Sequence, residues 1–118
     1  MKYLGTVLNN TDFTSDNNGF TSVSTYANTL YIASQKAMDD SDLYNVSPDL
    51  QGANDEYQLS MVQAHSTAVY VYSGVEECKK GNIETGISEI TQAIPNINSF
   101  IEHFSKTQNL LKAYKLKN

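Results

Sequence analysis

Apolar side chains recur along the last third of the chain at steps of four and three residues. With Gln108 as the single polar interruption, this row consists of Ile83, Ile87, Ile90, Ile94, Ile97, Ile101, Phe104 and Leu111. Alternating steps of three and four follow the 3.6-residue turn of an α-helix and place all members on one face. The spacing predicts a helix over residues 82–116 that packs on its neighbours through this isoleucine stripe.

Two earlier segments show the same periodicity with smaller side chains. Over residues 21–44 the row is Val23, Ala27, Leu30, Ser34, Ala37, Ser41 and Tyr44. Over residues 47–80 it is Leu50, Asn54, Tyr57, Met61, Ala64, Ala68, Val71, Val75 and Cys78. Ser47 is expected to cap this second helix ahead of Pro48, and Gly81 to end it in the left-handed conformation. Short connections make consecutive helices antiparallel neighbours.

Two segments fall outside this simple pattern. Pro95 removes a backbone donor and crowds the carbonyl of Thr91. Because the isoleucine period passes Pro95 without a phase shift, we expect a kink there rather than a break. Residues 1–20 are rich in turn-forming Asn, Asp, Ser and Gly and are expected to form an irregular arm. If residues 3–13 are helical, a four-helix variant results.

The chain of 118 residues fits one domain. We therefore predict a single all-α domain, an up-down-up antiparallel three-helix bundle with an N-terminal arm. Its members are the arm over 1–20 and helices over 21–44, 47–80 and 82–116.

Charge and composition exclude several classes of protein. The chain has 13 acidic residues, and its 8 basic residues are all lysine, for a net charge of -5. Without arginine, an acidic chain lacks the forked donors favoured in nucleic-acid recognition, so no nucleic-acid partner is expected. No run approaches the roughly 18 apolar residues of a membrane span, so no transmembrane segment is expected. The last sixteen residues hold four lysines and no acid, which complements the end of a helix.

The candidate sites for chemistry are weak. The acidic cluster 39–42 lacks the glycine and glutamate of a calcium-binding EF-hand loop. His65 and His103 lack the Glu-x-x-His spacing of di-metal bundles. Neither histidine has the lysine and glycine neighbours of a phosphotransfer site; His65 should flank the core and His103 face solvent. Cys78 ends a buried row beside two glutamates that raise the pKa of a thiol. We expect no enzyme activity, no cofactor and no metal.

The eight tyrosines give the one indication of binding. Three of them fall on or beside the stripes and are expected in the core, namely Tyr26, Tyr44 and Tyr57. Tyr31, Tyr70 and Tyr72 fall outside them and form the candidate interaction surface. The surface that Tyr70 and Tyr72 join is the N-terminal arm, a second copy or a protein partner.

Residues 43–51, LYNVSPDLQ, are followed by Tyr57 and by a helix that ends at Gly81. This stretch resembles small secreted or lipid-anchored helical domains of archaea, best known from methanogens, which have no assigned activity. The resemblance implies an exported bundle and no catalytic residues. No apolar stretch follows Lys2, so the N-terminus is not a signal peptide. We expect an extracellular or cell-surface location after removal of a signal or anchor, with the cytoplasm as the alternative.

Together these observations predict a non-enzymatic protein-interaction or cell-surface structural module. Two alternatives stay open. One is a bundle that senses or carries a small apolar ligand in a cavity near Pro95. The other is a cytoplasmic regulatory bundle.

Overall fold

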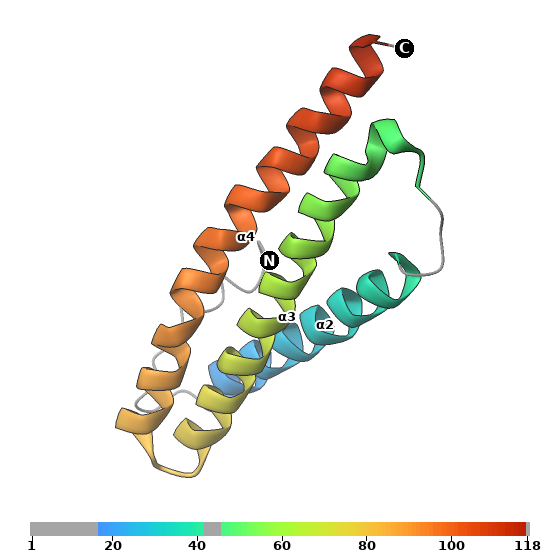
Figure 1. The fold of residues 1–118 in the computed structure, drawn as a ribbon. Helices are drawn as coiled ribbons and strands as arrows, with labels where there is room; N and C mark the ends of the chain where they lie inside the picture. The colour runs from blue at the N-terminus through green and yellow to red at the C-terminus, as the bar shows by residue number, and fades with distance from the viewer. Residues whose placement is uncertain (1–16, 42–45, 118) are drawn as a thin grey trace.

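A computed structural model of the chain describes residues 17–41 and 46–117. Three long helices make up almost all of this part: α2 (Asn17–Ser41), α3 (Gln51–Lys79) and α4 (Ile83–Lys117), with a short 3-10 helix, η1 (Pro48–Leu50), ahead of α3. No strand occurs among the described residues. The predicted all-α, up-down-up three-helix bundle is confirmed (Figure 1). Residues 1–16 of the arm expected over 1–20, which include the segment 3–13 of the four-helix variant, lie outside the described residues, as does Tyr44; residues 17–20 are helical.

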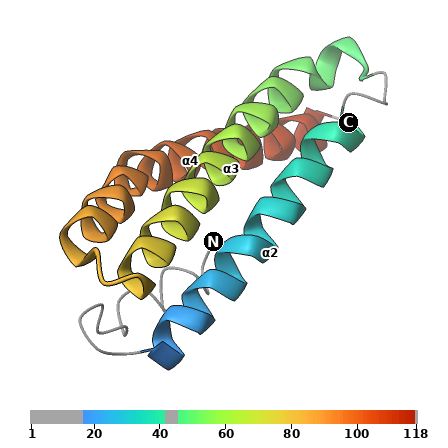
Figure 2. The same cartoon turned by 90° about the horizontal axis from the view of Figure 1, so that it is seen from below.

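The central helix is α3, which lies between the other two (Figure 2). Both α2 and α4 pack against α3, whereas no α-carbon of α2 lies within 8 Å of an α-carbon of α4 in the described ranges. The core is a cluster of buried side chains from all three helices, namely Phe20, Val23, Ala27, Val71, Val75, Cys78 and Ala93. This arrangement leaves α2 and α4 each with one flank that the other helices do not cover.

The contact between α3 and α4 is built from small residues. Among the buried positions on α3, Ser60, Thr67 and Gly74 are small residues seven apart, and Gly86 and Ala93 on α4 are buried small residues with the same spacing. A Cβ atom on Gly74 would lie 2.6 Å from the carbonyl oxygen of Gly86, closer than real Cβ atoms come to backbone. The two backbones therefore touch near the turn, a close approach that only glycine allows.

The isoleucine stripe forms this contact only in part: Ile83 and Ile90 pack against the core cluster, whereas other members of the row are exposed. Ile87, Ile94 and Ile101 are exposed, and Leu111 is exposed as well. Only the inner members of the row are partly buried, namely Ile83, Ile90, Ile97 and Phe104. Gly86 and Ala93, which flank the row, are buried, and Gly86 meets Gly74 of α3 at a distance that permits close packing of the two backbones.

The turn between α3 and α4 confirms the predicted terminator. Gly81 has a φ of 92°, in the left-handed region. Its N–H donates to the carbonyl of Cys78 at 3.0 Å, and the N–H of Asn82 donates to the carbonyl of Glu77 at 2.9 Å. These two bonds are the Schellman motif, which satisfies the last carbonyls of a helix.

Several helix ends differ from the expected ones. The first helix begins at Asn17, one turn before residue 21, which places Phe20 on the helix and in the core cluster. It ends at Ser41, and residues 42–45 are outside the described range. Ser47 holds the N-cap position of η1, but its side chain makes no capping hydrogen bond; the α-helical part starts only at Gln51. Helix α4 continues through Pro95 without a break.

Candidate functional site

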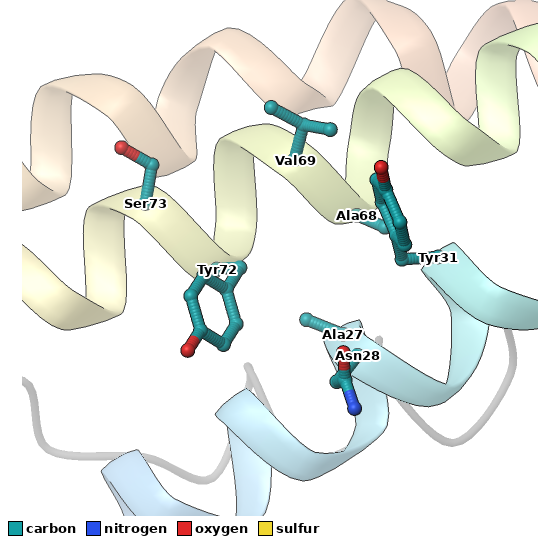
Figure 3. Close-up of a pocket in the computed structure, with 7 residues that line it drawn as sticks. All are labelled: Ala27, Asn28, Tyr31, Ala68, Val69, Tyr72 and Ser73. Carbon is teal, nitrogen blue, oxygen red and sulfur yellow. The ribbon is translucent and has the colours of Figure 1, made fainter.

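A hollow of about 520 Å³ lies between α2 and α3 (Figure 3). It opens to solvent, and its lining contains no charged side chain: Ala27, Asn28, Tyr31, Ala68, Val69, Tyr72 and Ser73. Tyr31 stands at one end, Tyr72 stands at the other, and Ala27 and Ala68 lie between them. Both alanines are fully buried, so they form the floor.

The sequence builds this hollow from two repeats of one spacing. Tyr31 follows Ala27 by four residues on α2, and Tyr72 follows Ala68 by four residues on α3. Residues four apart lie on one helix face, so each tyrosine stands one turn from its alanine. Because α2 and α3 are antiparallel, the step from Ala27 to Tyr31 and the step from Ala68 to Tyr72 run in opposite directions. The two tyrosines therefore lie at opposite ends of the hollow. The short alanine side chains leave the space between them unfilled.

Tyr31 is held in place by His65. Their ring centroids are 4.4 Å apart with an interplanar angle of 37°, a tilted aromatic contact. The Nε2 atom of His65 is buried and has no hydrogen-bond partner among the described residues. The histidine thus contributes a flat ring that supports the tyrosine, and it flanks the core.

The structure separates the three tyrosines of the candidate interaction surface. Tyr31 and Tyr72 are exposed and line the same hollow. Tyr70 lies on another face of α3 and packs, partly buried, against the core cluster. Tyr26 is exposed rather than in the core, because it falls beside the buried row of α2 and not on it. The sequence did not lead us to predict that Ala27, Ala68 and Val69 line a site. The two Ala-x-x-x-Tyr spacings do indicate that each alanine shares a helix face with a tyrosine.

Two side-chain hydrogen bonds join α3 to α4. His103 does not face solvent as expected: its Nδ1 lies 2.5 Å from the Glu56 carboxylate, and both side chains are partly buried. Further along the same pair of helices, the Ser73 hydroxyl donates to Glu89 at 2.7 Å. These contacts fix the register of α4 on α3.

Cys78 is buried at the end of the α3 row. Burial raises the pKa of its thiol above the ordinary value, and the negative charge of Glu77 raises it further. Since the thiolate is the nucleophile, a raised pKa lowers reactivity near neutral pH. This thiol has the character of a small apolar side chain, as its position at the end of the stripe predicted.

Cys78 should therefore react slowly in the folded protein. At pH 8 we expect an aromatic disulfide reagent to label it roughly tenfold or more slowly than in urea-unfolded protein. In the unfolded chain the thiol loses its proton at its ordinary pKa, whereas the folded chain retains it. The free energy of unfolding should consequently fall as the pH rises above the ordinary pKa of a cysteine thiol. Equal labelling rates in the folded and unfolded states would contradict this account of the residue.

Within residues 17–41 and 46–117, no group of three or more His, Cys, Asp or Glu side chains is placed to hold a metal ion. The helices in the described part of the chain include none long and apolar enough to cross a membrane. Four hollows lie along the described helices, and none of these four is lined by Pro95.

Comparison of the chain with protein-family models, with curated proteins and with solved structures gives no match in any of the three. The arrangement of the hollow therefore carries the functional argument by itself.

Proposed function

We propose that this domain is a non-enzymatic protein-interaction module that receives an apolar side chain of a partner in the hollow between α2 and α3. The observation that carries the proposal is the pair of exposed tyrosines, Tyr31 and Tyr72, at the two ends of an uncharged hollow with an alanine floor. Tyrosine is enriched at the centres of protein interfaces because it offers a large apolar face and a polar tip.

The shape of the hollow favours a peptide over a free small molecule. Its volume of about 520 Å³ is within the range of ligand sites, but small-ligand sites enclose most of the ligand surface. This hollow is open along one side and is bounded by the flanks of the two antiparallel helices α2 and α3. A side chain projecting from a larger partner fits such a site, because the rest of the partner covers the open side.

A peptide selection tests this proposal. We expect a random peptide library, selected on the immobilised domain, to yield peptides with a shared aromatic or branched aliphatic anchor. Replacing Tyr72 with alanine removes one end of the hollow and should weaken the selected peptides at least about tenfold, as for an interface hot spot.

Tyr26→Ala is the matched control, since Tyr26 is an exposed tyrosine of α2 that does not line the hollow. It should leave the affinity within about twofold of the wild type. Peptides that bind wild type, Tyr72→Ala and Tyr26→Ala equally would show that the hollow is not the binding site.

We further propose that the module acts at the cell surface. Charged residues are 18% of the chain, below the roughly 25% of average soluble domains, and the polar surface is mainly Asn, Ser and Thr. The resemblance of residues 43–51 to exported archaeal domains supports the same location. Fractionation of cells that express the complete gene tests it: recovery of the protein only in the cytoplasm would favour a regulatory role inside the cell.

A further inference from the structure

The chain has two histidines, and their surroundings differ. The Nδ1 atom of His103, on α4, lies against the Glu56 carboxylate of α3. The Nε2 atom of His65, on α3, is buried and has no hydrogen-bond partner among the described residues. Histidine is the side chain that ordinarily gains its charge between about pH 8 and pH 5. Lowering the pH through this range therefore acts on two imidazoles with different neighbours.

The part of α3 around His65 is free of other charge. Residues 57–75 contain no acidic residue and no lysine. The nearest charged residues on this helix are Glu56 and Glu76, nine and eleven residues away. At 1.5 Å per residue these distances exceed about 13 Å along the axis, so salt screens both carboxylates from the imidazole.

Helix α2 presents an uncharged face to His65 as well. The titratable group that faces it is the phenol of Tyr31, whose ring centroid lies 4.4 Å from that of the imidazole. Residues 17–35 of α2 contain no acidic residue and no lysine. The first charge beyond them is Lys36, which is exposed and pairs with Asp40 at 2.7 Å.

The same holds for α4 at this height of the bundle. His65 lies halfway along α3 between two contacts with α4, namely Glu56–His103 and Gly74–Gly86. Since the two helices are antiparallel, His65 is level with the middle of residues 90–101, which contain no acidic residue and no lysine. The first charges on either side of that range are Glu89 and Glu102.

A proton on Nε2 of His65 would thus create an N–H donor where the described residues offer neither an acceptor nor a counter-ion. A buried donor without an acceptor is costly, and a buried charge without a partner is more costly still. The face of Tyr31 attracts a cation, but one aromatic ring replaces only part of the lost hydration. Because His65 is partly buried rather than enclosed, its ring can turn towards water when it is protonated. That turn breaks the contact with Tyr31.

Protonation has the opposite consequence at His103. The imidazolium gains the Glu56 carboxylate as a counter-ion, and the two side chains join α3 to α4. On its own helix, the neighbouring Glu102 and Lys106 pair with each other at 3.2 Å. Acid therefore strengthens this contact until the carboxylate itself takes up a proton.

We propose that His65 makes the contact between α2 and α3 sensitive to acid: its protonation releases Tyr31 and loosens α2, while α4 stays in place on α3. Tyr31 forms one end of the hollow, so the hollow loses that end (Figure 3). The loosening of α2 is a property of the free domain and does not depend on a partner.

The two histidines act in opposite directions on the stability of the whole chain. The unfolded chain takes up a proton at His65 freely, whereas the folded chain must first expose the ring. The free energy of unfolding therefore falls at His65 as the pH falls. At His103 the folded state is the one that favours the proton, so acid raises the same quantity. A comparison of variants separates the two effects.

Melting temperatures at pH 7.5 and pH 5.5 test the role of His65. His65→Phe keeps a ring against Tyr31 but cannot be protonated. Acidification should lower the melting temperature of the wild type by roughly 4 °C more than that of His65→Phe. His65→Gln also stays neutral and gives the same comparison where the larger ring does not fit.

His103→Gln is the matched control, because it removes the other histidine. Without the strengthened pair, this variant should lose more stability on acidification than the wild type does. An equal pH dependence in the wild type and in the neutral variants of His65 would overturn the proposal.

Amide hydrogen exchange shows which helix loosens. After correction for the intrinsic rate at each pH, amides of α2 in the wild type should exchange at least about tenfold faster at pH 5.5 than at pH 7.5. Amides of α4 should keep their rates, and in His65→Phe those of α2 should keep theirs. Equal acceleration in α2 and α4, or acceleration of α2 that persists in His65→Phe, would contradict the proposal.

Acid control of binding in the hollow is a consequence that rests on the proposed function. A selected peptide without histidine should bind the wild type about fivefold more weakly at pH 5.5 than at pH 7.5, and His65→Phe equally at both. Unchanged affinity of the wild type would contradict acid control of the hollow. Failure to select any peptide at pH 7.5 would instead contradict the proposed function, whereas melting and exchange test His65 without a peptide.

Discussion

Replacing Gly74 with alanine should lower the free energy of unfolding by about 3 kcal/mol, at the upper end of the cost of overpacking. The added Cβ would lie 2.6 Å from the carbonyl oxygen of Gly86 and 2.5 Å from Ile90 Cγ1. The isoleucine can move, but the carbonyl belongs to the backbone of α4, so the two helices must separate near their turn. Thermal unfolding followed by circular dichroism should show a melting temperature lower by roughly 10 °C.

Gly52→Ala is the control for this substitution. A Cβ there would meet only Leu110 Cδ1, at 3.9 Å, an ordinary van der Waals distance. Since alanine loses less conformational entropy than glycine in a helix, Gly52→Ala should raise stability by about 0.5 kcal/mol. If Gly74→Ala unfolded at the wild-type temperature, the close approach of α3 and α4 would be refuted.

Val71→Ala should have the second largest effect, a loss of about 2 kcal/mol. Val71 is fully buried in the cluster where α2, α3 and α4 meet. Truncation removes two methyl groups from the packed core and leaves a cavity that rigid helices close only in part. Urea denaturation should show a lower midpoint with an unchanged slope.

Val69→Ala is the matched control, two residues away on the same helix. Val69 is exposed and lines the hollow, so its truncation should change stability by less than about 0.5 kcal/mol. It should nevertheless weaken the peptides selected on the hollow. Equal destabilisation by Val69→Ala and Val71→Ala would mean that the buried face of α3 is assigned wrongly.

The periodicity of the sequence predicted the fold class well because three regular amphipathic rows leave few alternatives to a helical bundle. It also predicted the turn at Gly81, since a glycine that follows two lysines at the end of an amphipathic helix commonly ends that helix in the left-handed conformation. These features depend on local backbone preferences, which a single sequence displays directly.

The same periodicity failed to predict which edge of α4 is buried. The isoleucines carry the larger apolar side chains, so they were expected to form the contact with α3. The structure buries Gly86 and Ala93 beside Ile90, because burial depends on the shape of the opposing helix: Gly74 of α3 lets Gly86 approach closely. Complementarity between two surfaces distant in sequence is not visible in either surface alone.

The candidate site was predictable in part. Tyr31 and Tyr72 were recognised as lying outside the buried rows, but their common location depends on how α2 and α3 align. Tyr70, one residue from the buried Val71, packs against the core cluster, which its position outside the strict row did not indicate. His103 was misplaced for a similar reason, since its neighbour Glu56 lies 47 residues earlier.

The most direct test of the proposed function is a nitrogen–proton NMR titration of the full chain with a peptide selected on the hollow. The account predicts that amide shifts are confined to the residues around the hollow, with the largest changes at Tyr31, Val69 and Tyr72, and that they disappear in Tyr72→Ala. Shifts centred on α4, or shifts that persist unchanged in Tyr72→Ala, would contradict it.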